Sequence, residues 1–193
     1  MNYWSEFEQT KLLSTKISFR PSFCIDTQNL YPGNTAYCIR TGSYPNYLAV
    51  LLNSQISEYY CRKVFLGKLG GFYEVQPDGL EAFPVPKPTS AELRLINEIN
   101  YASIAQQNPR LEQLLNGFVY ELFFKEDMHA HNLTLFAEAE KAGLSALSGL
   151  EGTALIQAAE QFAATHLVPG ARLRTMLSDI ATLDVVRIIE GRE

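Results

Sequence analysis

Cysteine is scarce in this sequence, which has only Cys24, Cys38 and Cys61 among its 193 residues. A small, odd number of widely spaced cysteines excludes a disulfide scaffold. Their apolar neighbours indicate small buried side chains in a reducing compartment and disfavour a redox site. Glycine and proline occur at ordinary levels, 12 and 9 residues, so the composition also excludes collagen-like and low-complexity disordered chains.

Long hydrophobic runs are absent. The longest stretch without a charged side chain is 41–57, and its unbroken apolar run is only Leu48–Leu52, which is too short to span a bilayer. The first residues contain neither a basic segment nor an apolar stretch, so no secretory signal is visible. We therefore expect a cytoplasmic protein that does not enter a membrane.

Positive charge is in short supply. Sixteen Lys and Arg residues oppose 21 Asp and Glu residues, a net charge of −5, which argues against a generally basic nucleic-acid binder. The imbalance is uneven, because residues 1–88 hold eight basic and seven acidic residues, whereas residues 89–193 hold eight and fourteen. The acidity therefore belongs to the second half of the chain.

Composition changes at the same place. Fifteen of the 22 aromatic residues precede residue 89, and 15 of the 18 alanines follow it. The alternating prolines of Pro84–Pro88 favour an extended segment at this point. We therefore predict a first subdomain at 1–88 and a second at 89–193.

The first subdomain reads as short strands around one helix. Turn residues and alternating patterns predict strands at Lys11–Phe19, Ser22–Asp26 and Thr35–Arg40, and a further strand that follows a glycine-rich turn and ends near Gln76. Apolar residues at three- and four-residue spacing predict one amphipathic helix over Tyr47–Phe65. This pattern is typical of a small mixed or antiparallel sheet with a packed helix.

The second subdomain reads as helical. Thr89 and Glu92 have the spacing of a capping box, and Asn108-Pro109 precedes a continuous apolar stripe from Leu111 to Phe123. Further helices are expected at Asn132–Ala142, Thr153–His166 and Ala171–Thr182, while Val185–Ile189 fits either a strand or a helical turn. The predicted fold class is therefore α+β, with an α-helical C-terminal subdomain.

Motifs for catalysis are missing. Gly67, Gly70 and Gly71 belong to no Gly-Lys-Ser/Thr or Gly-x-Gly-x-x-Gly arrangement, which disfavours a nucleotide site. His129 and His131 lack an evident third ligand, so a solvated helix entrance is favoured over a metal site. No Gly-x-Ser-x-Gly elbow and no plausible Cys–His pair occurs. We predict no catalytic and no metal-binding residue in this chain.

Several short motifs in the first half of the chain nevertheless occur in an order that is typical of one protein family. A leucine-rich helix pattern ends in Leu52-Asn53-Ser54, Gly70-Gly71-Phe72-Tyr73 follows, and Phe83-Pro84-Val85-Pro86 closes the segment. In this order they resemble the TaqI-like C-terminal specificity domain, the target-recognition module of type II adenine-N6 DNA methyltransferases and restriction-modification enzymes. The likeness is strongest from about Phe7 to Lys87, and weaker similarity continues to the tail at Ile188–Gly191.

The resemblance implies a specificity fragment or subunit that binds double-stranded DNA. The family's catalytic Asn/Asp-Pro-Pro-Tyr/Phe motif is missing, because no two prolines are adjacent, and so is a glycine-rich turn for S-adenosylmethionine. We therefore expect no cofactor in this chain. S-adenosylmethionine is expected on a catalytic domain, in cis or as a separate subunit, which flips and methylates the adenine.

Cations along the phosphates and a few donors at base edges would carry DNA binding. The candidates for these contacts are Lys16, Arg20, Arg40, Arg62, Lys63, Lys68, Tyr73 and Gln76. Among them, Arg20, Arg40 and Lys68 suit guanine, and Gln76 suits adenine. For Arg20, Arg40 and Lys68 the alternative is a solvated surface charge, and this alternative is favoured for Lys11. Arg62 and Lys63 also fit an interaction with the C-terminal dipole of their helix. Phe72 and Tyr73 fit the core, although the Tyr73 hydroxyl could reach an edge. Asn53 and Ser54 fit local backbone hydrogen bonds better than DNA contacts.

A second hypothesis belongs to another class. The acidic helical half would dock a protein partner, and the basic residues of the first half would be incidental. The two hypotheses diverge under salt, because phosphate contacts weaken steeply with salt concentration whereas an apolar docking surface changes little.

Overall fold

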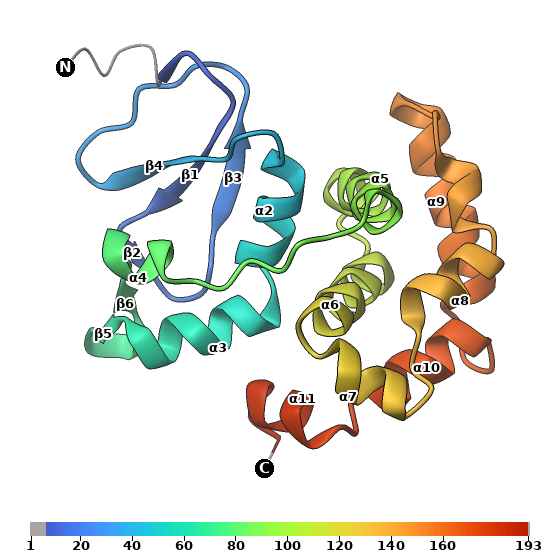
Figure 1. The fold of residues 1–193 in the computed structure, drawn as a ribbon. Coiled ribbons are helices and arrows are strands. Elements are labelled where there is room, and N and C mark those ends of the chain that lie inside the picture. Colours follow the sequence, from blue (N-terminus) through green and yellow to red (C-terminus); the bar gives the residue numbers. More distant parts are fainter. Residues whose placement is uncertain (1–6, 193) are drawn as a thin grey trace. The chain divides into compact units, whose positions relative to one another are not determined.

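The computed structural model describes residues 7–192, and the chain divides into two compact units, residues 1–85 and 86–193 (Figure 1). We call them the N-terminal unit and the C-terminal unit. The N-terminal unit combines two small antiparallel sheets with helices, and the C-terminal unit is helical. The predicted α+β class is confirmed, although the single expected sheet is replaced by two. Within residues 7–192, no helix is long and apolar enough to cross a membrane.

The larger sheet has the order β3-β1-β4, with β1 (Lys11–Thr15) in the middle between β3 (Phe23–Asp26) and β4 (Ala36–Arg40). Both neighbours run antiparallel to β1. Side chains alternate between the two faces of a strand, and Leu12, which is fully buried, points to the face that α2 (Pro45–Leu52) covers. This face forms part of the core of the unit.

The opposite face of this sheet explains the positions of two cysteines. Cys24 and Cys38 lie on either side of Leu13 in the antiparallel register, and both are exposed. The expectation that all three cysteines are buried is therefore wrong for these two, because they lie on the part of the opposite face that is open to solvent, whereas Lys11 and Asp26 farther along this face are buried. Cys61 is buried as expected.

The smaller sheet has the order β2-β6-β5 and lies beyond the end of β1 (Figure 1). It is formed by β2 (Ile17–Ser18), β6 (Tyr73–Glu74) and β5 (Leu66–Gly67). A short 3₁₀ turn, η1 (Leu69–Gly71), connects β5 to β6, so these two strands form a hairpin.

Two helices replace the one predicted over Tyr47–Phe65. The first, α2, ends at Leu52, and α3 spans Gln55–Val64. The break falls at Asn53-Ser54 because both side chains bond to backbone groups: Asn53 bonds to Phe23 of β3, and Ser54 caps α3 by accepting the Ser57 N–H. The hypothesis of local backbone bonding for these two residues is thereby confirmed. A further short helix, α4 (Pro77–Glu81), was not predicted.

The C-terminal unit consists of successive helices. Its elements are α5 (Ser90–Gln106), α6 (Pro109–Phe123), α7 (Lys125–Ala130), α8 (Leu135–Lys141), η2 (Leu144–Leu147), α9 (Gly152–His166), α10 (Arg172–Ile180) and α11 (Asp184–Ile189). The capping box of Thr89 and Glu92 and the Asn108 cap are present, which confirms the predicted starts of α5 and α6. The undecided segment at 185–189 is helical, and α7 was not predicted.

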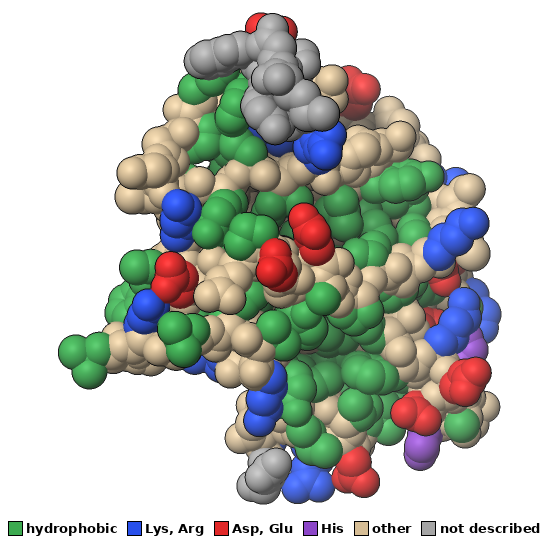
Figure 2. Space-filling view, turned by 60° about the vertical axis from the view of Figure 1, so that its left-hand side comes forward, with side chains coloured by type: hydrophobic (Ala, Val, Ile, Leu, Met, Phe, Trp, Pro, Cys, Tyr) green, Lys and Arg blue, Asp and Glu red, His purple; other side chains and the backbone are tan. Residues whose placement is uncertain are grey.

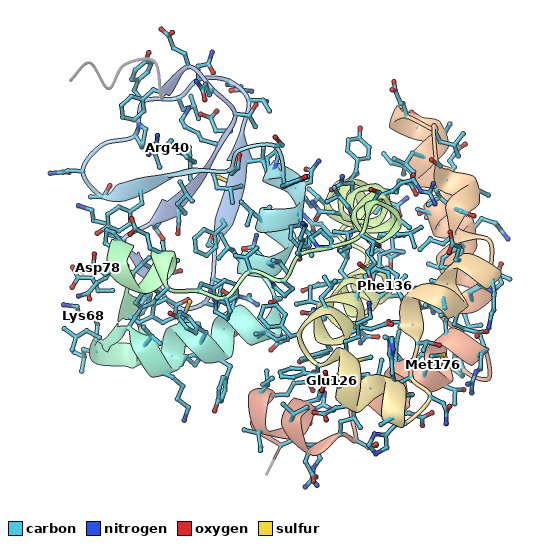
Figure 3. The ribbon with its side chains drawn as sticks, viewed as in Figure 1. Arg40, Lys68, Asp78, Glu126, Phe136 and Met176 are labelled. Atoms are coloured by element: carbon cyan, nitrogen blue, oxygen red, sulfur yellow. The ribbon has the colours of Figure 1, made fainter. Side chains whose placement is uncertain are left out.

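The apolar stripe of α6 forms the centre of this unit. Phe118 is fully buried, and its ring stacks on that of Phe136 from α8 with centroids 4.2 Å apart. Gly117 lets α6 approach its neighbours closely, because a Cβ at this position would lie 2.6 Å from Leu135 and 2.7 Å from Leu177. Helices of the same chain therefore cover the stripe, and Figure 3 shows Phe136 and Met176 among these helices.

Candidate functional site

Basic side chains from separate segments meet around the smaller sheet. This basic cluster consists of Lys16 just before β2, Arg20 just after it, Lys68 just after β5, and Arg62 and Lys63 at the end of α3, which leads into β5. The sequence predicted each as a candidate, but it did not predict that Arg62 would contact the segment after β2 or that Lys16 and Lys68 would both lie near Glu74. Figure 2 shows Lys and Arg side chains beside hydrophobic ones on the side of the molecule that is turned forward.

Arg62 connects α3 to the segment that follows β2. Its Nη2 donates to the carbonyl oxygen of Phe19 at 3.0 Å and to Glu58 at 2.8 Å. Its guanidinium also lies over the Phe19 ring, 5.2 Å from the centroid, in a cation–π contact. These contacts hold Arg62 in one position. An interaction with the C-terminal dipole of α3 alone would not need them.

Lys68 is held at the base of the hairpin turn. Its Nζ lies 2.6 Å from the Oε2 of Glu74 on the facing strand, and its backbone N–H donates to the Phe72 carbonyl at 2.7 Å. The hydrogen bond and the charge of Lys68 lower the pKa of Glu74, and the charge of Lys16 contributes further. Glu74 is therefore the anion around which two lysines of the basic cluster gather.

The other members of the basic cluster, Lys16, Arg20 and Lys63, form no salt bridge within residues 7–192, although Lys16 lies close enough to Glu74 to help lower its pKa. Lys16 lies over the Tyr37 ring and Lys63 over the Tyr59 ring, with Nζ 5.2 Å and 5.3 Å from the centroids. Arg20 is exposed, and it forms no salt bridge with any residue of the described range 7–192. These three side chains can offer their charge to an external anion.

Three predicted site residues lie outside the basic cluster. Arg40 ends β4 beside Lys11, where it lines a cavity of about 530 Å³ together with Leu48 and Leu80. Figure 3 shows Arg40 and Lys68 at separate places in the N-terminal unit. Gln76 is exposed between β6 and α4.

Tyr73 is a correction. The sequence names it as a DNA contact because its hydroxyl could reach an edge, while the core is the favoured alternative. The residue is only 2 % exposed and packs with Cys61, Phe65 and Val75 in the core of the unit, so the core alternative is confirmed. Burial raises the pKa of this tyrosine, and the neighbouring Cys61 adds to the effect. Tyr73 points inward because residues alternate along β6, so it cannot contact DNA from this position.

Lys11 is a second correction, because it is no surface charge. It is 1 % exposed, its Nζ lies 2.5 Å from the Oδ2 of Asp26, and the same nitrogen donates to the Phe7 carbonyl at 2.7 Å. The Lys11 ammonium is the main reason that the pKa of Asp26 is lowered, and backbone bonds from Gln28 and Leu30 act in the same direction. This ion pair belongs to the architecture of the sheet.

Exposed apolar side chains beside the basic cluster were not anticipated from the sequence. They are Ile17, Phe19, Leu66, Leu69 and Phe72, each more than two-fifths exposed. Phe72 was expected in the core, yet it is 43 % exposed. The neighbouring Gly70-Gly71 signals a tight turn. Which side chains at such a turn stay exposed depends on contacts with distant segments, such as that of Phe72 with Phe19, and no local sequence pattern specifies these contacts.

The histidines of α7 have structural partners. The Nε2 of His129 lies 2.9 Å from Glu121, and the buried carboxylate of Glu121 also accepts the Phe136 N–H at 2.8 Å. His129 and His131 lie at the end of α7, whereas a helix entrance was expected. Across residues 7–192, no group of three or more His, Cys, Asp or Glu side chains is arranged to hold a metal ion.

The N-terminal unit is thus a small α+β domain that presents basic and apolar side chains around a two-stranded hairpin. Residues 2–85 match the family described as the TaqI-like C-terminal specificity domain. The resemblance predicted from the motifs is confirmed over these residues, whereas the similarity of the later segments stays a prediction. No curated protein and no solved structure gives a significant match to the chain.

Proposed function

We propose that this chain is the DNA-specificity part of an adenine-N6 DNA methyltransferase or restriction-modification enzyme. The observation that carries the proposal is the match of residues 2–85 to the TaqI-like specificity domain. The basic cluster supports it, because its cations come from several elements next to the smaller sheet, within the matched residues, and a polyanion is bound by several cations together.

Within this proposal the two units have different tasks. The first subdomain, residues 1–88, contacts duplex DNA through Lys16, Arg20, Arg62, Lys63 and Lys68. Arg40 and Gln76 are candidates for a second contact region. The second subdomain, residues 89–193, has six more acidic than basic residues, so it is repelled by phosphates and serves as support or as a docking surface for the catalytic domain.

The methyl transfer is assigned to that catalytic domain, on the same or another polypeptide. S-adenosylmethionine supplies the methyl group there, and no residue of this chain is proposed to hold it. The specificity part contributes the choice of the site, since base contacts specify while phosphate contacts position the protein. The expected setting of such an enzyme is the cytoplasm.

The first test is selection of duplexes from a random DNA pool by the 193-residue chain, followed by a salt titration of binding to the selected duplex. We expect an enriched motif and a log–log salt slope of about −0.9 for each phosphate contacted. Binding without an enriched motif would contradict sequence recognition by this chain. Absence of binding would favour the protein-docking hypothesis over the proposed function.

A charge-reversal pair identifies the surface. We expect Arg20→Glu combined with Lys68→Glu to abolish duplex binding with little change in the melting temperature, because both side chains are exposed and the Lys68–Glu74 ion pair that is lost lies at the surface. The matched control is Arg110→Glu with Arg172→Glu, which changes the net charge equally at exposed first-turn positions of α6 and α10. Equal loss in both pairs would show that only net charge matters, and would remove Arg20 and Lys68 from the site.

A further inference from the structure

The hairpin of β5 and β6 presents a leucine that the fold does not use. Leu69, at the start of η1, is 99 % exposed, more than any other large apolar side chain described. A side chain this exposed adds nothing to the core, while an apolar group held in water is unfavourable until a partner covers it. Leu69 is therefore available to an external ligand.

The turn that carries Leu69 is closed and well defined. The backbone N–H of Lys68 donates to the Phe72 carbonyl at 2.7 Å across its base. Gly70 and Gly71 have φ values of 79° and 80°, a region that other residues rarely adopt. The two glycines let the chain reverse directly after Leu69, which leaves the leucine at the tip of the hairpin.

Aromatic side chains pack against the turn that carries Leu69. The Phe72 ring meets the Phe19 ring edge-on, with centroids 5.8 Å apart. The Arg62 guanidinium lies over the same Phe19 ring. A Cβ on Gly71 would lie 3.1 Å from the Phe19 ring, so the turn rests directly on it. The position of Leu69 is thus organised before any ligand arrives, which reduces the entropy lost on binding.

The charges around the tip select the kind of partner. Lys68 is adjacent in sequence, Arg20 follows Phe19, and Arg62 contacts that phenylalanine, whereas the nearby carboxylates of Glu58 and Glu74 already pair with Arg62 and Lys68. The tip is thus flanked by Arg20, which forms no salt bridge within residues 7–192, and by two cations that stay 39 % exposed in their salt bridges. Such a tip fits a ligand with stacked apolar groups between rows of anions. Duplex DNA has this chemistry, with bases between phosphates.

We infer that Leu69 is a wedge that enters between neighbouring base pairs and unstacks one step, while the basic cluster holds the flanking phosphates. This inference rests on the proposed function. Insertion of an apolar side chain costs the stacking energy of the step and is offset by the additional contacts that a bent duplex allows. The wedge would locate deformable steps, which adds selectivity without hydrogen bonds to bases.

The test uses the 193-residue chain and the duplex it selects, with 2-aminopurine placed at each position in turn. Fluorescence of this base rises when it is unstacked, so the parent chain should give a rise confined to one step. Leu69→Ser should abolish the rise and weaken binding about tenfold, the scale expected for burial of one leucine. The salt slope and the melting temperature should stay unchanged, because no charge and no core contact is lost.

Two further variants sharpen the result. Leu69→Met, which keeps an apolar side chain of similar size, should retain the fluorescence rise. Leu30→Ser removes another exposed leucine, located after β3 next to the Asp26 end of the larger sheet, and should behave like the parent chain. If the parent binds without a fluorescence rise, or if Leu69→Ser binds and unstacks as the parent does, the wedge is wrong and the proposed function stands. If the parent does not bind duplex DNA, both are overturned.

Discussion

At the scale of single residues, the most unusual pair is Lys11 and Asp26, two charges removed from water on adjacent strands. Each charge would be costly to bury alone, and the cost is offset by their 2.5 Å contact and by the N–H groups of Gln28 and Leu30 that Asp26 accepts. The pair also connects the start of β1 to the end of β3. Loss of one partner leaves the other buried without its counter-charge.

The acid limb of the stability curve should report this pair. The pKa of Asp26 is lower in the folded than in the unfolded chain. Its stabilising contribution is therefore complete above the unfolded pKa of about 3.9 and is lost as the pH falls through the folded value. We expect Asp26→Asn to lower the melting temperature by several degrees at pH 7. As the pH is lowered, the melting temperature of this variant should decrease less than that of the parent. Parallel curves for Asp26→Asn and the parent between pH 7 and pH 3 would contradict this role.

At the scale of elements, the break between α2 and α3 shows how one side chain can hold a strand. The Asn53 amide accepts the Phe23 N–H at 2.9 Å and donates to the Phe23 carbonyl at 2.8 Å, so it pairs with the edge of β3 as a neighbouring strand would. It also donates to the Ala49 carbonyl. The same amide thus ends α2 and satisfies the backbone of β3.

Truncation of this side chain should be costly for a polar position. Asn53→Ala leaves the backbone N–H and carbonyl of Phe23 without their side-chain partner, and we expect a loss of about 1–3 kcal/mol in the free energy of unfolding, measured by urea denaturation. Asn53→Asp keeps the acceptor but places a carboxylate oxygen against the carbonyls of Phe23 and Ala49, so it should cost at least as much as Asn53→Ala. A change below about 0.5 kcal/mol for Asn53→Ala, the scale of ordinary surface substitutions, would show that water replaces the amide without cost.

The contrast between the two units explains what the sequence could predict. The helices of the C-terminal unit follow from local signals, since the Thr89 capping box and the period of Leu111–Phe123 act within a few residues. The split at Asn53 and the burial of Tyr73 depend on β3 and Cys61, which lie far away in the sequence. The basic residues could therefore be predicted from the sequence as candidates for DNA contacts. Their positions around the hairpin and the exposure of Leu69 could be seen only in the tertiary structure.

At the scale of the whole molecule, the distribution of charge matters more than its sum. A chain with a net charge of −5 repels DNA at long range, but the basic cluster and the excess acidity belong to different units. Fields from exposed charges extend over about 10 Å at 0.1 M salt and about 30 Å at 0.01 M. The acidic C-terminal unit should therefore oppose the encounter with DNA at low salt and matter little at physiological salt.

This opposition is measurable as an association rate. Glu151 and Glu160 are exposed, and neither forms a salt bridge within the range 7–192. Replacement of both by Gln should raise the association rate with duplex DNA about twofold at 10 mM salt, while the dissociation rate stays unchanged. The gain should vanish at 150 mM salt, where screening removes the long-range field. Replacement of both by Asp, which keeps the charge, serves as the control and should associate at the parental rate. A gain that persists at high salt, or one that appears in the dissociation rate, would mean that these glutamates lie against the DNA, and the C-terminal unit would then belong to the binding surface.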